Sequence, residues 1–165
     1  MSLLTKWRGF LRYTGLMPKS GLKQLGPGDV VPDLRLETLR GGSESLREAG
    51  GVLLVFFKIS CPVCQLTLPY LQRIHPATKV WGVSQNGADD TQEFADYYKL
   101  TFPILLDPED RFPASNAFGI THVPTTFLLA GSGRIDRVIE GWNRQEMQSL
   151  GAVTASDNVP AWKAG

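Results

Sequence analysis

One uninterrupted apolar run, Val52–Phe57, constrains the fold of this chain more than any other segment. A run of six apolar residues predicts a strand that is buried on both faces, as in a sheet covered by helices on each side. A helix is predicted to follow from Cys61 to about Ile74, because Leu66, Tyr70 and Ile74 stand at helical spacing. The chain therefore passes from a buried strand to the first turn of a helix at Cys61.

Strand and helix patterns alternate along the rest of the chain, which predicts a layered α/β fold with a central mixed sheet flanked by helices. The predicted strands are residues 80–84, 103–107, 125–129 and 134–140, and the predicted helices are residues 89–99, 113–118 and 144–150. A glycine-rich link, residues 130–133, is expected to join the last two strands as a hairpin. In the helix that begins at residue 89, Phe94, Tyr97 and Tyr98 are expected to form the buried face.

The chain is expected to have three parts. Residues 1–25 carry five basic side chains and no acidic one. They predict an arm or helix that packs on the domain, lies on a membrane or serves as a targeting peptide. Residues 26–29 break the chain before an extended segment at 30–37. Residues 26–152 are therefore expected to form one globular domain, and residues 153–165 an irregular C-terminal tail.

The net charge indicates the expected class of partner, and the apolar segments indicate the expected compartment. The chain has 17 basic and 16 acidic side chains, a net charge of +1, which favours protein or small-molecule partners over nucleic acid. No segment has the roughly 20 apolar residues that span a bilayer, and the start lacks a secretory apolar core. A cytoplasmic location is expected, with a periplasmic or other extracytoplasmic one as the alternative if a signal segment has been removed.

The only two cysteines, Cys61 and Cys64, are arranged as a redox site. A helix N-terminus stabilises a thiolate at Cys61, and Cys64 is within disulfide reach. Lys58 is expected to lower the pKa of Cys61, and Pro62 suits the first helical turn, where its missing N–H needs no partner. The alternatives are two buried structural thiols, or a copper site completed by His122. His122 is otherwise expected as an exposed loop residue or a proton shuttle.

Several motifs together resemble the thioredoxin superfamily, and more narrowly the redoxin group of TlpA/ResA-type thiol–disulfide oxidoreductases and peroxiredoxin (AhpC/TSA) relatives. The matching segments are Gly28–Asp33, Val52–Cys64 with Pro69 after it, Trp81–Ser84, Phe102–Asp107 and Phe118–Phe127. The resemblance implies a thioredoxin-like fold and thiol–disulfide exchange with protein substrates through Cys61 and Cys64, with no cofactor and no metal. It also implies a cis Val123–Pro124 bond that faces the cysteines, with Val123 placed to pair with an extended substrate segment.

The chain departs from the family pattern at three positions. Thioredoxin-like reductases often have a buried carboxylate where this chain has Val55, and TlpA/ResA-type proteins often have a glutamate where it has Thr67. Without these acids, no side chain is an obvious base for Cys64. Peroxiredoxins resemble one another through a hydroxyl residue where this chain has Lys58. This departure disfavours a thiol peroxidase, which stays an alternative beside a copper-binding or redox-sensing module.

The main prediction is a dithiol oxidoreductase. Its Cys61 thiolate attacks a substrate disulfide, and Cys64 then attacks the mixed disulfide and releases the reduced substrate. The reverse direction uses the same chemistry, so the pair needs either an upstream reductant or an upstream oxidant.

Overall fold

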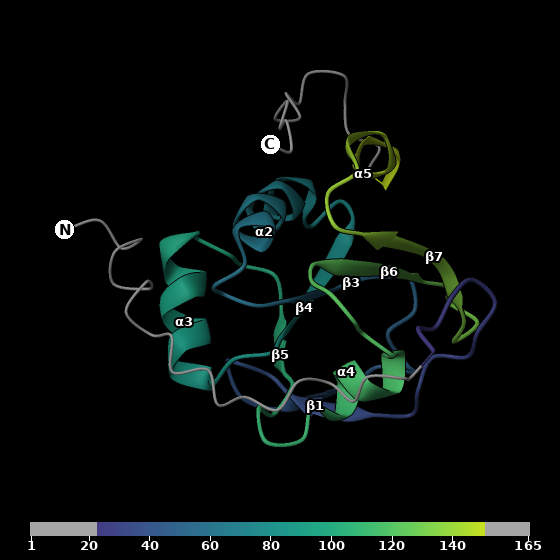
Figure 1. Ribbon diagram of the computed structural model, residues 1–165, viewed down its shortest axis with the longest axis horizontal. Helices are drawn as coiled ribbons and strands as arrows, with labels where there is room; N and C mark the ends of the chain where they lie inside the picture. Colours follow the sequence, from purple (N-terminus) through teal and green to yellow (C-terminus); the bar gives the residue numbers. More distant parts are fainter. Residues whose placement is uncertain (1–22, 151–165) are drawn as a thin grey trace.

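The computed structural model describes residues 23–150 (Figure 1). Residues 1–22 of the predicted basic arm, and the predicted C-terminal tail at residues 153–165, lie outside the described residues. The division of the chain at residues 26 and 152 therefore stays a prediction.

A mixed five-stranded sheet forms the centre of the fold. Its strands, in spatial order, are β5 (Ile104–Leu106), β4 (Lys79–Ser84), β3 (Val52–Phe57), β6 (Thr125–Leu129) and β7 (Ile135–Glu140). The central strand β3 runs parallel to β4 and antiparallel to β6. Every residue of β3 is buried, as its continuous apolar run predicts. The predicted α/β class and the predicted mixed sheet are confirmed.

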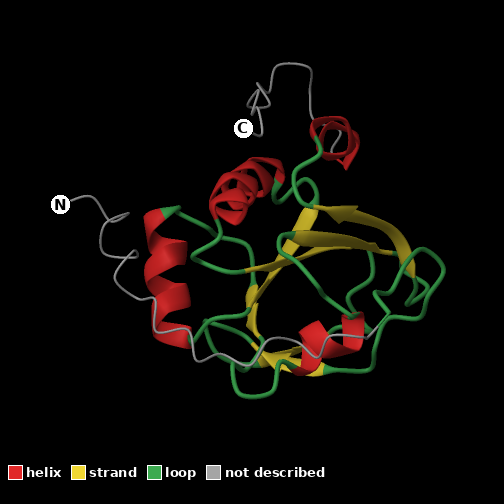
Figure 2. Cartoon of the chain, in the orientation of Figure 1, coloured by secondary structure: helices red, strands yellow, loops and turns green. Residues whose placement is uncertain are grey.

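Helices cover both faces of this sheet (Figures 1 and 2). The remaining elements are β1 (Arg35–Glu37), β2 (Ser43–Ser45), α2 (Pro62–Ile74), α3 (Ala88–Tyr97), α4 (Pro113–Phe118) and α5 (Arg144–Leu150). Side chains of α2, α3 and α5 share one buried cluster with one face of β3. Side chains of α4 and of the β1–β2 hairpin share a second cluster with the other face. The molecule is therefore a three-layer α/β fold.

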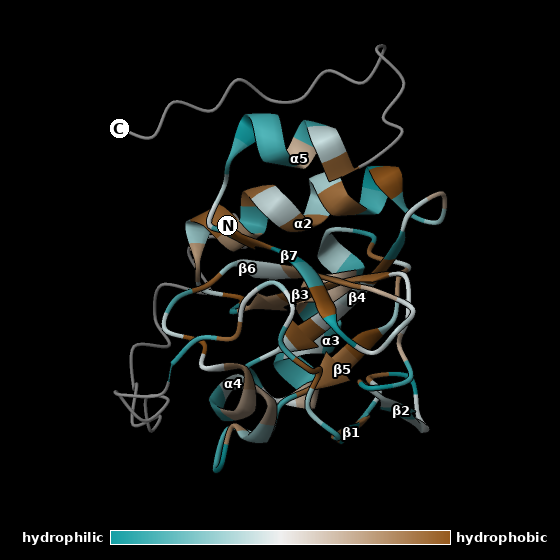
Figure 3. Ribbon diagram, turned by 90° about the vertical axis from the view of Figure 1, so that its right-hand side faces the viewer, coloured by the Kyte–Doolittle hydropathy of each residue, from teal (hydrophilic) through white to brown (hydrophobic). Residues whose placement is uncertain are grey.

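The alternation of side chains along β3 divides the core between these two clusters. Leu53, Val55 and Phe57 face α2 and α3, whereas Val52, Leu54 and Phe56 face α4. Figure 3 shows hydrophobic residues gathered on the central strands and hydrophilic ones on the outer helix α5. A strand buried between two helical layers is fixed on both faces, which makes its C-terminal end a rigid base for the loop that follows.

One expectation about local structure is wrong, and one short strand was not predicted. Tyr97 was expected to be buried, but it is 50% exposed, and Tyr98 is half-buried. The buried positions of α3 are Thr91, Phe94 and Ala95, so the apolar face is one turn earlier than the aromatic residues indicate. The hairpin strand β2 was also not expected, because its sequence, Ser-Glu-Ser, has no apolar alternation.

The register of the sheet brings three loops to one edge. Phe56 of β3 pairs with Thr125, the first residue of β6, and Phe57 pairs with Ser84, the last residue of β4. The loop after β3 therefore lies beside the loop before β6 and the loop after β4. This edge carries both cysteines.

Candidate active site

The Cys-x-x-Cys motif lies where β3 ends and α2 begins. Cys61 is the N-cap residue of α2, with an extended backbone (φ −82°, ψ 117°), and Pro62 is the first helical residue. Proline is tolerated there because the first N–H groups of a helix have no intrahelical acceptor. The predicted positions of both residues are confirmed.

The two thiols differ in exposure. Both cysteines are free, Cys61 is half-buried, and Cys64 has no exposed surface. The backbone N–H of Cys64 donates to Cys61 Sγ at 3.4 Å. Only Cys61 therefore presents sulfur to an incoming substrate.

The helix terminus and the second cysteine set the acidity of Cys61. A hydrogen bond from the Cys64 thiol is the largest cause that lowers the pKa of Cys61, from 9.0 to about 6. Partial burial opposes this change, while the backbone N–H groups of Cys64 and Val63 and the charge of Lys58 reinforce it. Cys61 is therefore mostly thiolate at neutral pH.

Cys64 shows the opposite behaviour. Burial raises its pKa far above the ordinary value, and the hydrogen bond to Cys61 and the charge of Cys61 raise it further. Its side chain belongs to the core cluster that α2 shares with β3. Cys64 is therefore a protonated thiol while Cys61 is a thiolate.

The loop before β6 approaches the cysteines from the opposite side. The Val123–Pro124 peptide bond is cis, which confirms the expectation. Cys61 Sγ lies 3.5 Å from the Val123 carbonyl oxygen, to which the sulfur can donate only in its protonated form. Pro124 is buried and its carbonyl accepts from the Gly141 N–H at 2.8 Å, which attaches this loop to the end of β7.

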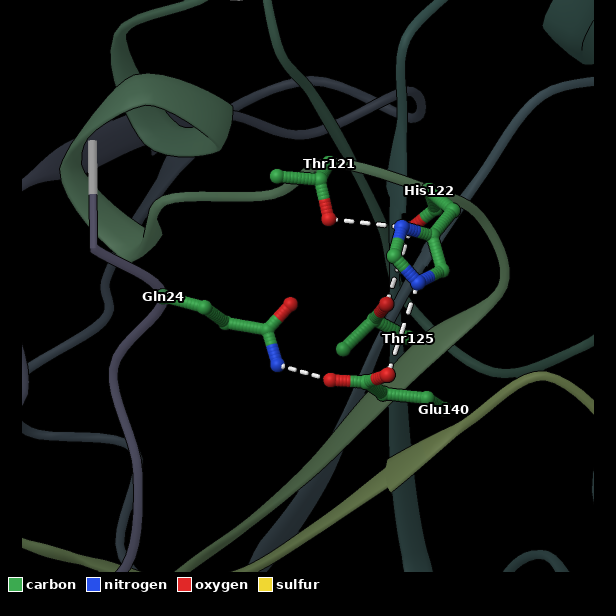
Figure 4. A network of polar contacts seen from close by, with 5 residues as sticks. All are labelled: Gln24, Thr121, His122, Thr125 and Glu140. Carbon is green, nitrogen blue, oxygen red and sulfur yellow. Dashed lines mark hydrogen bonds and ion pairs between the residues drawn. The ribbon is translucent and has the colours of Figure 1, made fainter. Parts of the chain in front are cut away.

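His122 takes part in a polar network with Thr121 and Glu140 (Figure 4). Its Nε2 lies 3.4 Å from a carboxylate oxygen of Glu140 in β7, and its Nδ1 lies 2.6 Å from the Thr121 hydroxyl. Gln24 donates to the other Glu140 oxygen. The Thr125 hydroxyl donates to the His122 carbonyl oxygen at 2.8 Å. With 62% of its side chain exposed, His122 is the exposed loop residue that was one of the expectations.

The two positions at which family members often have an acid hold neutral side chains in this protein. Val55 and Thr67 are both fully buried, and the Thr67 hydroxyl donates to the Val63 carbonyl oxygen within α2. Within residues 23–150 no three His, Cys, Asp or Glu side chains group as metal ligands. The copper site of Cys61, Cys64 and His122 is therefore not formed in the part of the chain described. Nor is any helix of that part long and apolar enough to cross a bilayer.

Sequence reasoning missed two amide side chains that contact the loop between β3 and Cys61. Gln65 and Asn86 both hydrogen-bond the backbone of Ile59. Asn86 follows β4, and parallel neighbouring strands end at the same edge of a sheet, so its position was a usable signal. Gln65 gave no such signal, because an amide in the first turns of a helix is ordinarily solvated.

Known proteins share this fold and this site. The model of the AhpC/TSA family matches residues 27–138. The thiol-disulfide oxidoreductase ResA of Geobacillus thermodenitrificans (strain NG80-2) is 31% identical over 127 residues, which cover 72% of each chain. The thioredoxin-like protein YneN of Bacillus subtilis (strain 168) is 32% identical over 168 residues, which cover 88% of this chain and 96% of that one.

Solved structures agree on the architecture. The thioredoxin domain of a thiol-disulfide oxidoreductase from Bacteroides vulgatus superposes with a TM-score of 0.65 at 23% identity, over 72% of this chain and 91% of that one. This likeness confirms the thioredoxin-like fold. The relatives confirm the predicted class of activity, thiol–disulfide oxidoreductase, which uses cysteines in place of a cofactor. The chain belongs to the AhpC/TSA family, as its motifs predicted.

Proposed function

We propose that Cys61 is the attacking nucleophile of a thiol–disulfide oxidoreductase and that Cys64 is the resolving thiol. The observation that carries this assignment is the asymmetry of the pair. Cys61 is half-buried with a pKa of about 6, whereas Cys64 is fully buried with a strongly raised pKa. A thiolate is the reactive form, so attack on an external disulfide begins at Cys61.

The first step transfers the substrate to the protein. The Cys61 thiolate attacks one sulfur of a substrate disulfide, a Cys61–substrate disulfide forms, and the other substrate sulfur leaves as a thiolate. The low pKa of Cys61 follows from the donors around its sulfur, so the attack needs no separate base. Oxidation of a substrate dithiol is the same sequence in reverse.

The second step releases the reduced substrate. Once Cys61 is bonded to substrate, its negative charge is gone, which removes one cause of the raised pKa of Cys64. Cys64 gives its proton to water or to the departed substrate thiolate, and its sulfur attacks Cys61 Sγ. A Cys61–Cys64 disulfide forms and the second substrate sulfur leaves. The pair gives two electrons to the substrate. One of the two protons that the substrate thiolates take up comes from Cys64 and the other comes from water, because Cys61 reacts as a thiolate.

The neighbouring residues have supporting roles in this proposal. Val123 and Pro124 present a backbone edge beside Cys61, which suits an extended substrate segment that pairs as an added strand. Pro62 stiffens the first turn of α2, and Lys58 lowers the pKa of Cys61 by its charge. The contacts of His122 with Thr121 and Glu140 support a role in shaping the loop rather than in proton transfer.

The class of partner follows from this chemistry, whereas the compartment does not. The class of enzyme acts on protein thiols and disulfides, and we propose an upstream protein reductant or oxidant as the second partner. We propose the cytoplasm as the compartment, with the periplasm or another extracytoplasmic compartment as the alternative. Cell fractionation, with the redox state of Cys61 and Cys64 trapped by acid and alkylation, tests the compartment and the direction together.

The mechanism is tested by disulfide reduction with three variants. Reduced protein is mixed with insulin, and the loss of its disulfides is followed by mass. Cys61→Ser is expected to abolish the reaction, and Cys64→Ser to stop after the first step and accumulate a mixed disulfide at Cys61. Ser60→Ala, beside the motif and exposed, serves as the matched control and keeps full activity. Full activity of Cys61→Ser, or a mixed disulfide on Cys64 in the wild type, overturns the assignment.

A further inference from the structure

The turn that leads into Cys61 is held at one residue by two side-chain amides. The Ile59 N–H donates to Asn86 Oδ1 at 3.0 Å, and the Ile59 carbonyl oxygen accepts from Gln65 Nε2 at 2.8 Å. Asn86 follows β4 and Gln65 belongs to α2, so the two amides approach Ile59 from different elements. The Ile59 side chain is itself 5% exposed and belongs to the core cluster.

Asn86 is fixed in turn by a pair of buried hydroxyls. Its N–H donates to Ser84 Oγ at 3.1 Å, and its carbonyl oxygen accepts from Thr91 Oγ1 at 3.3 Å. Ser84 and Thr91 lie 2.7 Å apart at their hydroxyl oxygens, and neither has exposed surface. A continuous set of hydrogen bonds therefore connects α3 and the end of β4 to the turn before the cysteine.

The position of this turn determines how Cys61 meets its helix. The Cys61 N–H donates to the Lys58 carbonyl oxygen at 3.2 Å, so the turn at residues 58–61 is closed on itself. Cys61 must enter α2 with its extended N-cap backbone for its sulfur to lie against the N–H of Cys64. The geometry of Ile59, two residues earlier, sets this entry.

We infer that Asn86 and Gln65 are positioning residues that hold the turn at Ile59 so that Cys61 sulfur stays against the N-terminal N–H groups of α2. Neither amide touches the sulfur in any hydrogen bond described. They act through the backbone of Ile59, which has both of its polar groups occupied by side chains. This inference rests on the proposed role of Cys61 as nucleophile, because it explains what keeps that sulfur ready to react.

The test replaces each amide by an apolar side chain of similar length and measures the pH profile of Cys61. Asn86→Leu removes the acceptor for the Ile59 N–H, and Gln65→Met removes the donor to its carbonyl oxygen. The rate of iodoacetamide modification of Cys61, distinguished from Cys64 by fragmentation of the peptide that holds both, is measured from pH 4.5 to pH 9. Each variant is expected to raise the pKa of Cys61 by about one unit, the equivalent of one lost hydrogen bond to a charged group.

Matched controls remove equivalent hydrogen bonds elsewhere. Gln72 lies on the same helix as Gln65 and bonds the backbone and hydroxyl of Thr101, so Gln72→Met is the control for Gln65→Met. Asn143 accepts from the backbone N–H of Glu146, so Asn143→Leu is the control for Asn86→Leu. Both controls are expected to leave the pKa of Cys61 unchanged, even where they lower the melting temperature.

The outcomes separate positioning from general stability. A rise in pKa in the two test variants alone supports the inference. An unchanged pKa in folded test variants overturns it, and so does an equal rise in the controls. If Asn86→Leu fails to fold, Gln65→Met decides by itself, because its amide is on a half-exposed helical position. The alkylation profile needs no substrate, so it stands apart from the insulin assay that tests the proposed function.

Discussion

The hydrogen bond between the two cysteines is the most informative contact to perturb. The Cys64 thiol is the largest cause that lowers the pKa of Cys61 to about 6. Hydrogen bonds to charged groups contribute about 1.5–3 kcal/mol, and we take the lower end because a thiol is a weak donor and Cys61 is partly solvated. Division by 1.36 kcal/mol per pKa unit gives a rise of about one unit when the donor is removed. Cys64→Ala is therefore expected to bring the pKa of Cys61 to about 7.

The assay is the pH dependence of iodoacetamide modification followed by intact mass, since Cys61 is then the only thiol. At pH 6 the thiolate fraction should fall from about one half to about one tenth, so modification is about fivefold slower, and the rates converge above pH 8. Cys64→Ser retains a hydroxyl donor and should show a smaller shift. An unchanged profile in Cys64→Ala refutes the reasoning, as does an equal shift in the two variants.

Three further predictions concern stability. Gly119 has φ +69°, and an added Cβ would lie 2.7 Å from Gln24 Cα. Gly119→Ala should therefore lower the free energy of unfolding by at least about 2 kcal/mol in urea titration. Gly131→Ala is the control and should change this free energy little, because a Cβ at Gly131 would meet open space. Asp107 accepts from the N–H groups of Ala114 and Ser115, so Asp107→Ala should cost about 3 kcal/mol in the same titration, and a cost no larger than that of exposed Asp110→Ala would contradict this. The pKa of Cys61 falls from 9.0 to about 6 on folding, so the unfolded state binds more protons than the folded state between these pH values. The free energy of unfolding of the reduced protein, relative to that of Cys61→Ser, should therefore rise from pH 6 to pH 9, and this gain should be lost as the pH falls through about 6. A difference that does not change with pH would show that the folded pKa is not lowered.

The sequence predicts best those parts of the fold whose structure depends on residues that are neighbours along the chain. The apolar run of β3 and the glycine-rich link before β7 each carry their own structure, because burial on both faces and turn chemistry are local properties. The polar strand β2 forms only because β1 pairs with it, so nothing in its own residues indicates it. Tyr97 shows a related failure, since aromatic character does not say which helical face is covered.

The residues of the site likewise fall into those that local sequence identifies and those that only the tertiary structure reveals. Cys61 and Cys64 could be identified from spacing, and the approach of Val123 only from the family resemblance. The position of Asn86 after β4 indicates the edge of the sheet at which it lies, but its hydrogen bond to Ile59 also depends on the register of β3 against β4. Asp107 was part of a predicted strand, yet it is a fully buried carboxylate whose pKa burial raises, and no residue type nearby distinguishes it from a solvated aspartate.

The contacts of the short segment Lys23–Leu25 determine where a shortened fragment of this protein can begin. The Leu25 N–H donates to the Phe118 carbonyl oxygen at 3.0 Å, Gln24 bonds Glu140, and the Lys23 backbone lies directly against Gly119. A fragment that starts at Gly26 would leave the end of α4 and the Glu140 carboxylate without these neighbours, beside the loop that carries Val123. Fragments for crystallisation or for fusion to another protein should therefore start before Lys23.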